Sequence, residues 1–393
     1  MNNPDAGKLA VLIFRKRLLP PSQTFVVTPA RSFATFRPVF VGLLKEQAGW
    51  HLVEPYPTAL LSQFRPFWFH RLLLKLAGRP ASVWVNAIKA YRPAIVHAQF
   101  GWDGMQALHL AKALAVPLVV HLRGSDIMRV DASRRYIRDR RRLYREAQAI
   151  IAVSQFVRSR LIQDGCPDGK IVVHYDGIDT DFWQPAGNPR PGRICFVGRL
   201  VEWKGCQHLI RAAAILLSKG HQIELGVVGD GPMREYLHEL SRSLGLQVQF
   251  TGMLPPDQVR DQLGRSWVCC VPSIVLPDGS CEGLGNVSLE AQACGVPVVV
   301  GQSGGLPETI VDGQTGLVVD AQDDQLLARA ISGLLTDPAR RNKMSQAARD
   351  HVLARFNLAL QAKRLEDLYE RLIAEHGHST KQKLMEMSHD EGN

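Results

Sequence analysis

Short apolar runs alternate with segments of helical character, and this alternation occurs twice along the chain. Such alternation is typical of βαβ units, whose parallel sheets are covered by helices on both faces. A stretch rich in proline and glycine, residues 176–192, separates the two series. The length of 393 residues also fits more than one domain. The sequence therefore predicts an α/β protein with two doubly wound, Rossmann-like domains that face each other across a cleft.

Five apolar runs predict strands in the first half of the chain, and five more predict strands in the second half. The expected strands are residues 9–14, 95–97, 118–121, 149–153, 171–173, 194–197, 223–228, 248–251, 267–271 and 296–300. We expect helices over residues 39–47, 105–115 and 357–375. Ser154 follows directly after a predicted strand, and its hydroxyl is suited to cap the helix that comes next.

These elements divide the chain into two domains and a tail. Residues 1–185 form the expected N-terminal domain, and residues 186–356 form the second domain. The amphipathic helix of residues 357–375 is expected to pack back on the first domain. Residues 376–393 are a polar tail that we expect to be disordered.

The net charge of +10 is concentrated in the first half of the chain. Residues 1–189 hold 26 Lys and Arg against 13 Asp and Glu, whereas residues 190–393 hold 21 against 24. The densest basic cluster runs from Arg134 to Arg145, where Ile137 and Leu143 could form part of an apolar strip on a helix. Three interpretations stay open: a solvated helix face, a surface for anionic lipid headgroups or a phosphorylated acceptor, and a nucleic-acid surface. No base-reading motif accompanies the charge, so we expect no nucleic acid as partner.

Several protein classes are disfavoured by simple features of the sequence. The seven cysteines are odd in number and irregularly spaced, which predicts reduced thiols rather than disulfides or a zinc site. The sequence contains no run of about 18 apolar residues, so it predicts no transmembrane helix. The N-terminal residues also lack the pattern of a signal peptide. We expect a cytoplasmic protein, in free solution or attached peripherally to the inner face of the cell membrane.

The strongest chemical signal is a pair of glutamates, Glu282 and Glu290, in a glycine-rich loop that enters a helix. Eight residues make little more than two helical turns, so both carboxylates could face one ligand. Free backbone N–H groups of residues 283–286 would point to the same place. A carboxylate can accept two hydroxyl donors, as a ribose or a hexose presents them. On spacing alone, the alternative is two surface glutamates that the helix dipole favours.

With the motifs that follow it, this pair resembles the family-4 retaining glycosyltransferases of the GT-B fold, in particular group 1 enzymes of exopolysaccharide and lipopolysaccharide synthesis. The matching motifs are Glu282-x7-Glu290, Gly295-Val-Pro-Val298, Gly304-Gly305-Leu-Pro-Glu308 and Asp312-Gly-x-Thr-Gly316. They occur in the family's order and, with the loop at Gly198, cover residues 194–320. The general layout of the family covers nearly the whole chain. The resemblance implies a two-domain enzyme that uses a nucleotide-activated sugar.

The resemblance also assigns roles to individual residues. Arg199 and Lys204 would neutralise the donor diphosphate as a leaving group. Glu290 would bind the ribose hydroxyls, whereas Glu282 and the adjacent N–H groups would hold the sugar hydroxyls. The residues expected to bind the donor are Gly198, Arg199, Lys204, Gly229, Met253, Gly283, Leu284, Gly285, Asn286, Val287 and Glu290. Glu282 and His121 are the expected catalytic residues.

The acceptor half matches the family more loosely. His121 begins the segment His-Leu-Arg-Gly-Ser-Asp, which resembles a strand-end segment whose histidine faces the donor sugar. A purely structural histidine is the alternative, and His97, Arg123 and Asp126 are further candidates for contact. The segment 22–26 is similar to the Ser-Glu-Thr-Phe segment of exopolysaccharide-type members, with glutamine in place of glutamate. The glycine pair that many members carry after the first strand is absent here.

The reaction implied is transfer of a hexose from a UDP-sugar or GDP-sugar to a glycan or lipid-linked acceptor, with retention of configuration. The leaving diphosphate would act as the base, so neither a metal nor another cofactor is expected. A nicotinamide oxidoreductase is disfavoured because the Gly-x-Gly-x-x-Gly motif is incomplete, with Arg234 at its third glycine. The remaining alternatives are a nucleotide-sugar binding protein without turnover and another GT-B enzyme, such as an epimerase or a sucrose-type synthase.

Overall fold

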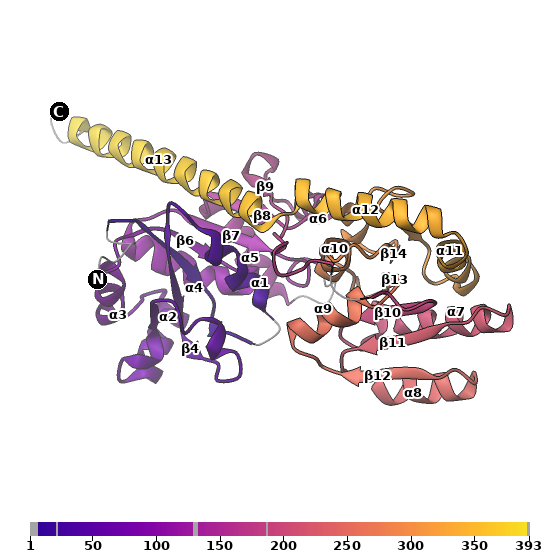
Figure 1. The fold of residues 1–393 in the computed structure, drawn as a ribbon. Helices are drawn as coiled ribbons and strands as arrows, with labels where there is room; N and C mark the ends of the chain where they lie inside the picture. Colours follow the sequence, from indigo (N-terminus) through magenta and orange to yellow (C-terminus); the bar gives the residue numbers. More distant parts are fainter. Residues whose placement is uncertain (1–6, 21–22, 129–132, 186–187, 391–393) are drawn as a thin grey trace.

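The computed structural model describes residues 7–20, 23–128, 133–185 and 188–390, with side chains described up to residue 378. It has two lobes, each built on one parallel sheet (Figure 1). The N-terminal sheet has the strand order β5-β3-β1-β6-β7-β8-β9. These strands are β1 (Ala10–Phe14), β3 (Arg37–Gly42), β5 (Thr58–Leu60), β6 (Pro93–Ala98), β7 (Leu118–Leu122), β8 (Ala149–Ala152) and β9 (Ile171–Val173).

The C-terminal sheet has the strand order β12-β11-β10-β13-β14-β15. Its strands are β10 (Arg193–Val197), β11 (Glu224–Val228), β12 (Val248–Gly252), β13 (Val268–Val271), β14 (Val298–Gly301) and β15 (Gly316–Val319). All ten strands expected from the sequence are present, so the prediction of two doubly wound parallel domains is confirmed.

Helices lie between the strands and cover both sheets (Figure 1). In the N-terminal lobe they are α1 (Thr24–Val27), α2 (Phe67–Ala77), α3 (Ser82–Lys89), α4 (Gly101–Leu114), α5 (Arg134–Glu146) and α6 (Gln155–Gln163). In the C-terminal lobe they are α7 (Cys206–Ser218), α8 (Arg234–Ser243), α9 (Pro256–Gly264), α10 (Asn286–Ala293), α11 (Asp324–Thr336) and α12 (Pro338–Arg355). Ser154 caps α6 as expected, because its hydroxyl accepts a hydrogen bond from Val157 N.

The prediction of a helix over residues 39–47 is wrong. This segment forms most of β3 and then the short strand β4 (Leu44–Lys45), which pairs with β2 (Arg17–Leu18). Strand β3 lies between β1 and β5, and residues Pro38 to Gly42 are all buried. A run of consecutive apolar residues suits a strand covered on both faces, whereas an amphipathic helix would leave part of the run in water.

The N-terminal sheet is buried on both faces by alternate side chains of its strands. In β1, Leu12 and Phe14 point into the core formed with α3 and α4, while Val11 points to the opposite face. The last helix, α13 (Leu358–Asp390), covers that opposite face with four buried side chains. They are Leu365, Leu368, Tyr369 and Leu372. The C-terminal helix therefore completes the N-terminal core (Figure 1).

Glu366 secures this docking from a buried position on α13. Its carboxylate accepts hydrogen bonds from Ala34 N, Thr35 N and Phe36 N at 3.1, 2.8 and 3.0 Å. Helix α13 also runs on to Asp390, so the polar tail that we expected to be disordered is helical up to that residue. The helix and the tail thus form one continuous element rather than two.

The two chain crossings between the lobes lie side by side. Ile178 N donates to Phe356 O at 2.7 Å, and Leu358 N donates to Ile178 O at 2.9 Å. This paired connection joins the proline-rich and glycine-rich stretch to the start of α13. The two crossings are therefore tied to each other by backbone hydrogen bonds.

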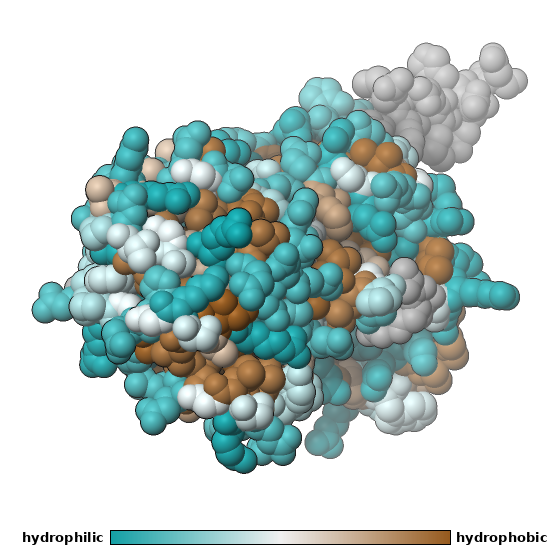
Figure 2. Space-filling view, turned by 90° about the vertical axis from the view of Figure 1, so that its right-hand side faces the viewer, coloured by the Kyte–Doolittle hydropathy of each residue, from teal (hydrophilic) through white to brown (hydrophobic). Residues whose placement is uncertain are grey.

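Hydrophilic and hydrophobic side chains are interspersed on the end of the C-terminal lobe (Figure 2). No helix among the described residues is long and apolar enough to span a bilayer.

Candidate functional site

The expected donor-binding residues gather where the strands of the C-terminal sheet end. Gly198 and Arg199 follow β10, Gly229 follows β11, and Met253 follows β12. These strands are neighbours in the sheet, so their carboxyl ends form one edge, which is the usual binding edge of a parallel α/β sheet. The turns that follow β10 and β11 approach each other closely. Gly229 has φ +134°, and a side chain there would collide with the Gly198 carbonyl. Glycine at position 229 is therefore what allows these two turns to pack against each other.

Lys204 and Glu282 form an ion pair at this edge. Lys204 Nζ lies 2.5 Å from Glu282 Oε1, and Ser273 Oγ donates to the same oxygen at 2.9 Å. Glu282 is buried, and the ring of Trp203 lies 4.6 Å from the Lys204 ammonium. The ammonium and the carboxylate are thus held in one orientation. Ser273, which follows β13, was not identified from the sequence, because an isolated serine carries no spacing signal.

The glycine-rich loop of residues 283–287 presents a row of backbone N–H groups next to this pair. We call it the donor loop, after its expected ligand. Among the described residues, the backbone N–H groups of residues 283–287 have no hydrogen-bond partner. Gly285 has φ +94° and directly precedes α10, so the row continues into the first turn of that helix. The side chain of Leu284 is buried in the core of the N-terminal lobe, and only its backbone is available. Such N–H groups at a helix start are suited to bind anionic or hydroxyl oxygens.

Glu290 projects from α10 into a cavity of about 360 Å³ between the lobes. Thr24 and Phe25 from α1 and Asn286 from the donor loop line the same cavity. Burial raises the pKa of Glu290 from its ordinary value of 4.5 to about 7, and the nearby Lys204 cation opposes this rise. The sequence motif around Phe25 and the carboxylate of Glu290 therefore meet at one cavity, although more than 250 positions separate them along the chain.

The N-terminal lobe contacts the donor loop directly. Ser154 Oγ donates to Gly283 O at 2.7 Å, and a side chain at Gly283 would collide with the Arg123 carbonyl. Glu308, from the Gly-Gly-Leu-Pro-Glu motif, accepts hydrogen bonds from Gln155 N and Phe156 N at 2.8 Å each. These two N–H groups belong to the first turn of α6, where an acid is favoured. The motif thus joins the C-terminal lobe to a helix of the N-terminal lobe.

Asp176 makes a second link between the lobes. It forms an ion pair with Arg123 Nη1 at 2.6 Å and accepts a hydrogen bond from Asn286 Nδ2 at 3.0 Å. Arg123 in turn lies 4.4 Å from the centre of the Phe25 ring. Sequence reasoning placed Asp176 only in a linker, because nothing local shows which side chains the linker meets.

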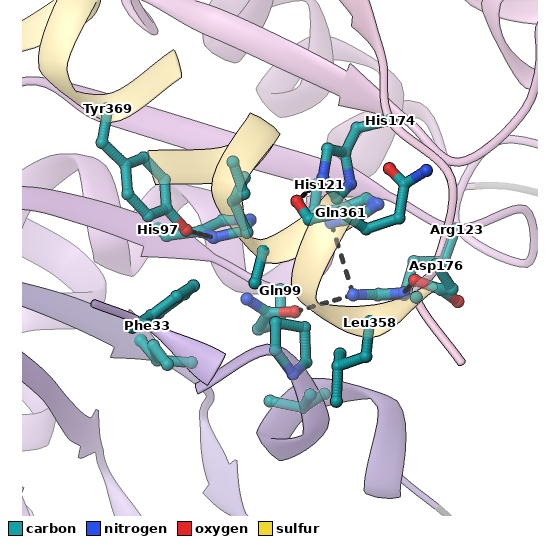
Figure 3. A pocket seen from close by; sticks show the side chains of 16 residues that line it. Phe33, His97, Gln99, His121, Arg123, His174, Asp176, Leu358, Gln361 and Tyr369 are labelled. Atoms are coloured by element: carbon teal, nitrogen blue, oxygen red, sulfur yellow. Dashed lines mark hydrogen bonds and ion pairs between the residues drawn. The ribbon is translucent and has the colours of Figure 1, made fainter. Parts of the chain in front are cut away.

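His121 lies in a different environment from the glutamate pair. It is buried in β7, and its ring stacks on His97 with centroids 5.6 Å apart. With His174, Arg123 and Tyr369 these residues line a cavity of about 10 Å³, room for about one water molecule (Figure 3). Burial lowers the pKa of His97 to about 3 and that of His121 well below 6.5, and the Arg123 cation adds to both shifts. Both rings are therefore neutral at ordinary pH.

The burial of His121 and its stacking on His97 thus favour a structural role for this residue. Its contact with the donor sugar stays a prediction. Two residues of that segment lie against the loop at Gly283: Arg123, through its backbone carbonyl, and Gly124. Asp126 is buried and accepts hydrogen bonds from Gly101 N, Arg123 N and Gly124 N, so it shapes the loop.

The remaining expected residues are placed as follows. Arg199 is exposed at the edge of the cleft, and Met253 is 79% exposed. Val287 is half-buried in the first turn of α10. Gln23 accepts a hydrogen bond from Arg15 Nε at 2.9 Å, whereas Pro21 and Ser22 lie outside the described residues. Within the described chain, no group of three or more His, Cys, Asp or Glu side chains is arranged to hold a metal ion.

Two family models match the chain and together cover most of it. The model "Glycosyltransferase Family 4" matches residues 24–182, and "Glycosyl transferases group 1" matches residues 177–351. Among relatives, the amylovoran biosynthesis glycosyltransferase AmsK of Erwinia amylovora is 30% identical over 75% of this chain and 74% of its own length.

A GDP-mannose-dependent alpha-(1-6)-phosphatidylinositol monomannoside mannosyltransferase of Mycolicibacterium smegmatis is 35% identical over 58% of this chain. That match spans 63% of the relative, less than two thirds of its length. Among solved structures, Anabaena HepE in complex with UDP and glucose superimposes with a TM-score of 0.76 at 21% identity. The match covers 92% of this chain and all of HepE, so the two share a fold. The chain belongs to the group 1 and family 4 glycosyltransferases, which confirms the resemblance found in its motifs.

Proposed function

We propose that this protein is a retaining glycosyltransferase that moves a hexose from a nucleoside-diphosphate sugar to a glycan or lipid-linked acceptor in cell-surface polysaccharide synthesis. The observation that carries the proposal is the Lys204–Glu282 pair beside the free N–H groups of residues 283–287. It combines a cation for a diphosphate, a carboxylate for sugar hydroxyls and donors for oxyanions at one edge of the cleft. The relatives support it, since two of them are named as glycosyltransferases of polysaccharide or glycolipid synthesis.

The donor lies across the cleft with its nucleoside toward Glu290 and its sugar toward Glu282. Glu290 accepts hydrogen bonds from the ribose hydroxyls in the cavity that Phe25 also lines. Lys204 and Arg199 bind the diphosphate. The side chain of Arg199 is exposed, so it can turn toward the bound diphosphate. The donor is a UDP-sugar or a GDP-sugar, which are the nucleotides named for HepE and for the mannosyltransferase.

In the reaction, the bond between the anomeric carbon and the diphosphate oxygen breaks. The acceptor oxygen bonds to the same carbon from the same face, and its proton passes to an oxygen of the leaving diphosphate. The products are the glycoside with retained configuration and the free nucleoside diphosphate. We propose that Lys204, Arg199 and the N–H groups of the donor loop stabilise the developing charge, so that no metal is required.

The acceptor is presented at the inner face of the cell membrane, to which the protein attaches peripherally. Helix α5 supports this placement, because Arg134, Arg138, Arg141 and Arg145 are exposed. Arg140 is the exception: it is buried and forms two hydrogen bonds with Asp164, at 2.7 and 2.6 Å. The exposed arginines would attract anionic lipid headgroups in a salt-sensitive manner.

The test is a panel of UDP-sugars and GDP-sugars incubated with the protein and membrane extract, with mass detection of the product. Lys204→Ala and Glu290→Ala are expected to lower turnover and to weaken binding of the matching nucleoside diphosphate by about 10-fold or more in calorimetry. Lys219→Ala is the matched control, since it removes an exposed positive charge at the far end of α7. Full turnover in both site variants would refute the assignment, and nucleotide binding without transfer would favour a binding protein.

A further inference from the structure

Asp176 is a buried carboxylate at the boundary between the lobes, and both of its oxygens have partners. Its Oδ1 lies 2.6 Å from Arg123 Nη1, and its Oδ2 accepts a hydrogen bond from Asn286 Nδ2 at 3.0 Å. Arg123 has a second acceptor in Gln99, whose Oε1 lies 3.1 Å from Arg123 Nη2 (Figure 3). Because Asp176 is only 8% exposed, these contacts fix its orientation with little competition from water.

These contacts determine which end of the Asn286 amide faces Asp176. A carboxylate that is paired with a guanidinium can only accept hydrogen bonds, so the amide must turn its NH2 group toward it. The oxygen of the amide is then directed away from Asp176. No described residue donates a hydrogen bond to this oxygen, and Asn286 lines the cavity of about 360 Å³ between the lobes. The side chain thus presents a hydrogen-bond acceptor to a ligand in the cavity.

Glu290 supplies a second acceptor one helical turn further along α10. Asn286 is the first residue of that helix and Glu290 lies four positions later, so the two side chains share a face. The Cα–Cβ bonds of a helix tilt toward its N-terminus, so Glu290 leans toward Asn286. Both residues line the same cavity. Two acceptors side by side fit a diol whose hydroxyls both donate hydrogen bonds.

A second buried ion pair shows what a purely structural carboxylate looks like in this protein. Both oxygens of Asp164 accept hydrogen bonds from Arg140, at 2.7 and 2.6 Å, and one of them also accepts the hydroxyl of Tyr144. All three residues belong to the N-terminal lobe. Asp176 instead shares its oxygens between that lobe and the donor loop, so its position sets the orientation of a side chain in the cleft.

We propose that the side-chain oxygen of Asn286 accepts a hydrogen bond from one hydroxyl of the donor ribose, and that Asp176 is the positioning residue that gives the amide this orientation. Glu290 accepts the other hydroxyl, and the two side chains together recognise the 2′,3′-diol of a nucleoside diphosphate. The proposal rests on the proposed function, because it requires the donor nucleoside in this cavity. It deepens that function by naming the groups that select a ribonucleotide.

Asp176→Asn is expected to reverse the Asn286 amide. A guanidinium has no acceptor, so the amide introduced at position 176 keeps its oxygen toward Arg123 and turns its NH2 group toward Asn286. Asn286 must then give its oxygen to that NH2 group and present its own NH2 group to the cavity. Asp176→Asn combined with Asn286→Asp is expected to restore an acceptor, because a carboxylate at position 286 has lone pairs for both partners.

The probes are UDP and GDP in which fluorine, which cannot donate a hydrogen bond, replaces the 2′-hydroxyl or the 3′-hydroxyl. In calorimetry, each fluoro analogue is expected to bind the unmodified protein about 10-fold more weakly than its parent nucleotide. Asp176→Asn should reduce this factor to about 2-fold at one of the two positions and leave the other, which Glu290 reads, unchanged. The combined variant should restore it. Each factor compares two ligands on one protein, so a loss of folded protein does not alter it.

Asp164→Asn is the matched control, since it weakens a buried Asp–Arg pair without contact to the donor loop, and it should leave both factors unchanged. Four results would overturn the proposal: no discrimination by the unmodified protein, no effect of Asp176→Asn, an equal effect at both positions, or no restoration in the combined variant. If nucleotides bind and one of these results is found, the glycosyltransferase assignment still stands. Failure of every form to bind either nucleotide would overturn both proposals.

Discussion

The hydroxyl of Ser154 donates a hydrogen bond of 2.7 Å to the carbonyl oxygen of Gly283, and this bond joins the N-terminal lobe to the donor loop. The same serine caps α6, so one side chain orders a helix start and orients the loop whose N–H groups are proposed to bind the donor. The two lobes are therefore coupled at the residues proposed to bind substrate, and each contact at this boundary can be tested.

Replacement of Ser154 by alanine is expected to lower both stability and transfer. Loss of the cap costs about 1 kcal/mol, and loss of the bond to Gly283 lowers kcat/KM by up to about 10-fold because the loop is less well oriented. Ser133→Ala is the control, since Ser133 caps α5 and does not contact the donor loop. Urea unfolding and transfer assays should show a similar loss of stability in both variants and a loss of activity only for Ser154.

Glu308→Gln tests the link between the lobes. The carboxylate accepts two backbone N–H groups at the start of α6 and the hydroxyl of Tyr175 at 3.0 Å, whereas an amide offers one oxygen and places an N–H group against these donors. We expect kcat/KM to fall by about 10-fold or more. Asp323→Asn, which alters a helix cap wholly within the C-terminal lobe, should leave kcat/KM unchanged, and an equal effect in both variants would show that the link is not specific.

The pH dependence of nucleotide binding should report on Glu290. Because the pKa of this carboxyl is about 7, its proton is lost as pH rises through that value, and the carboxylate then accepts the ribose hydroxyls. Affinity for UDP or GDP in calorimetry is thus expected to increase from pH 6 to pH 8. The pKa is raised in the folded state, so this group makes the free energy of unfolding fall as pH rises from 4.5 to 7. Glu290→Gln should remove both dependences.

The histidine cluster should produce the opposite trend. The pKa values of His97, His121 and His174 are lowered by burial, so the unfolded chain binds protons that the folded protein excludes. Their contribution to stability is complete above pH 6.5 and is lost as pH falls toward 3, the pKa of His97. His97→Asn should therefore give a smaller loss of unfolding free energy between pH 7 and pH 5, measured in urea. An unchanged slope would mean that His97 is not buried in its neutral form.

Much of the architecture followed from local pattern. The strands β7 and β8 are continuous apolar runs, and runs of that length between helical segments have few other interpretations. Residues 39–47 were misjudged because a buried strand and a buried helix look alike in a short apolar run, and only the pairing of β3 with β1 and β5 separates them.

The candidate site likewise contains residues that the sequence predicts and residues that it does not predict. Glu282, Glu290 and Lys204 carry motif spacing and were found from the sequence. Ser273 and Asp176 were missed, because each acts through a partner that is far away in the chain. His121 is predicted from its position in a family motif. Its burial beside His97 depends on the folded lobe and has no signal in the sequence.

The two-domain α/β class, the family and the residues proposed to meet the donor can be read from the chain without a structure, because they depend on periodicity and on short motifs. The pairs of groups that meet across the cleft, such as Ser154 with Gly283 and Glu308 with α6, are seen only in the folded protein. These relationships join segments that are distant in sequence, so they arise from packing and have no local signal.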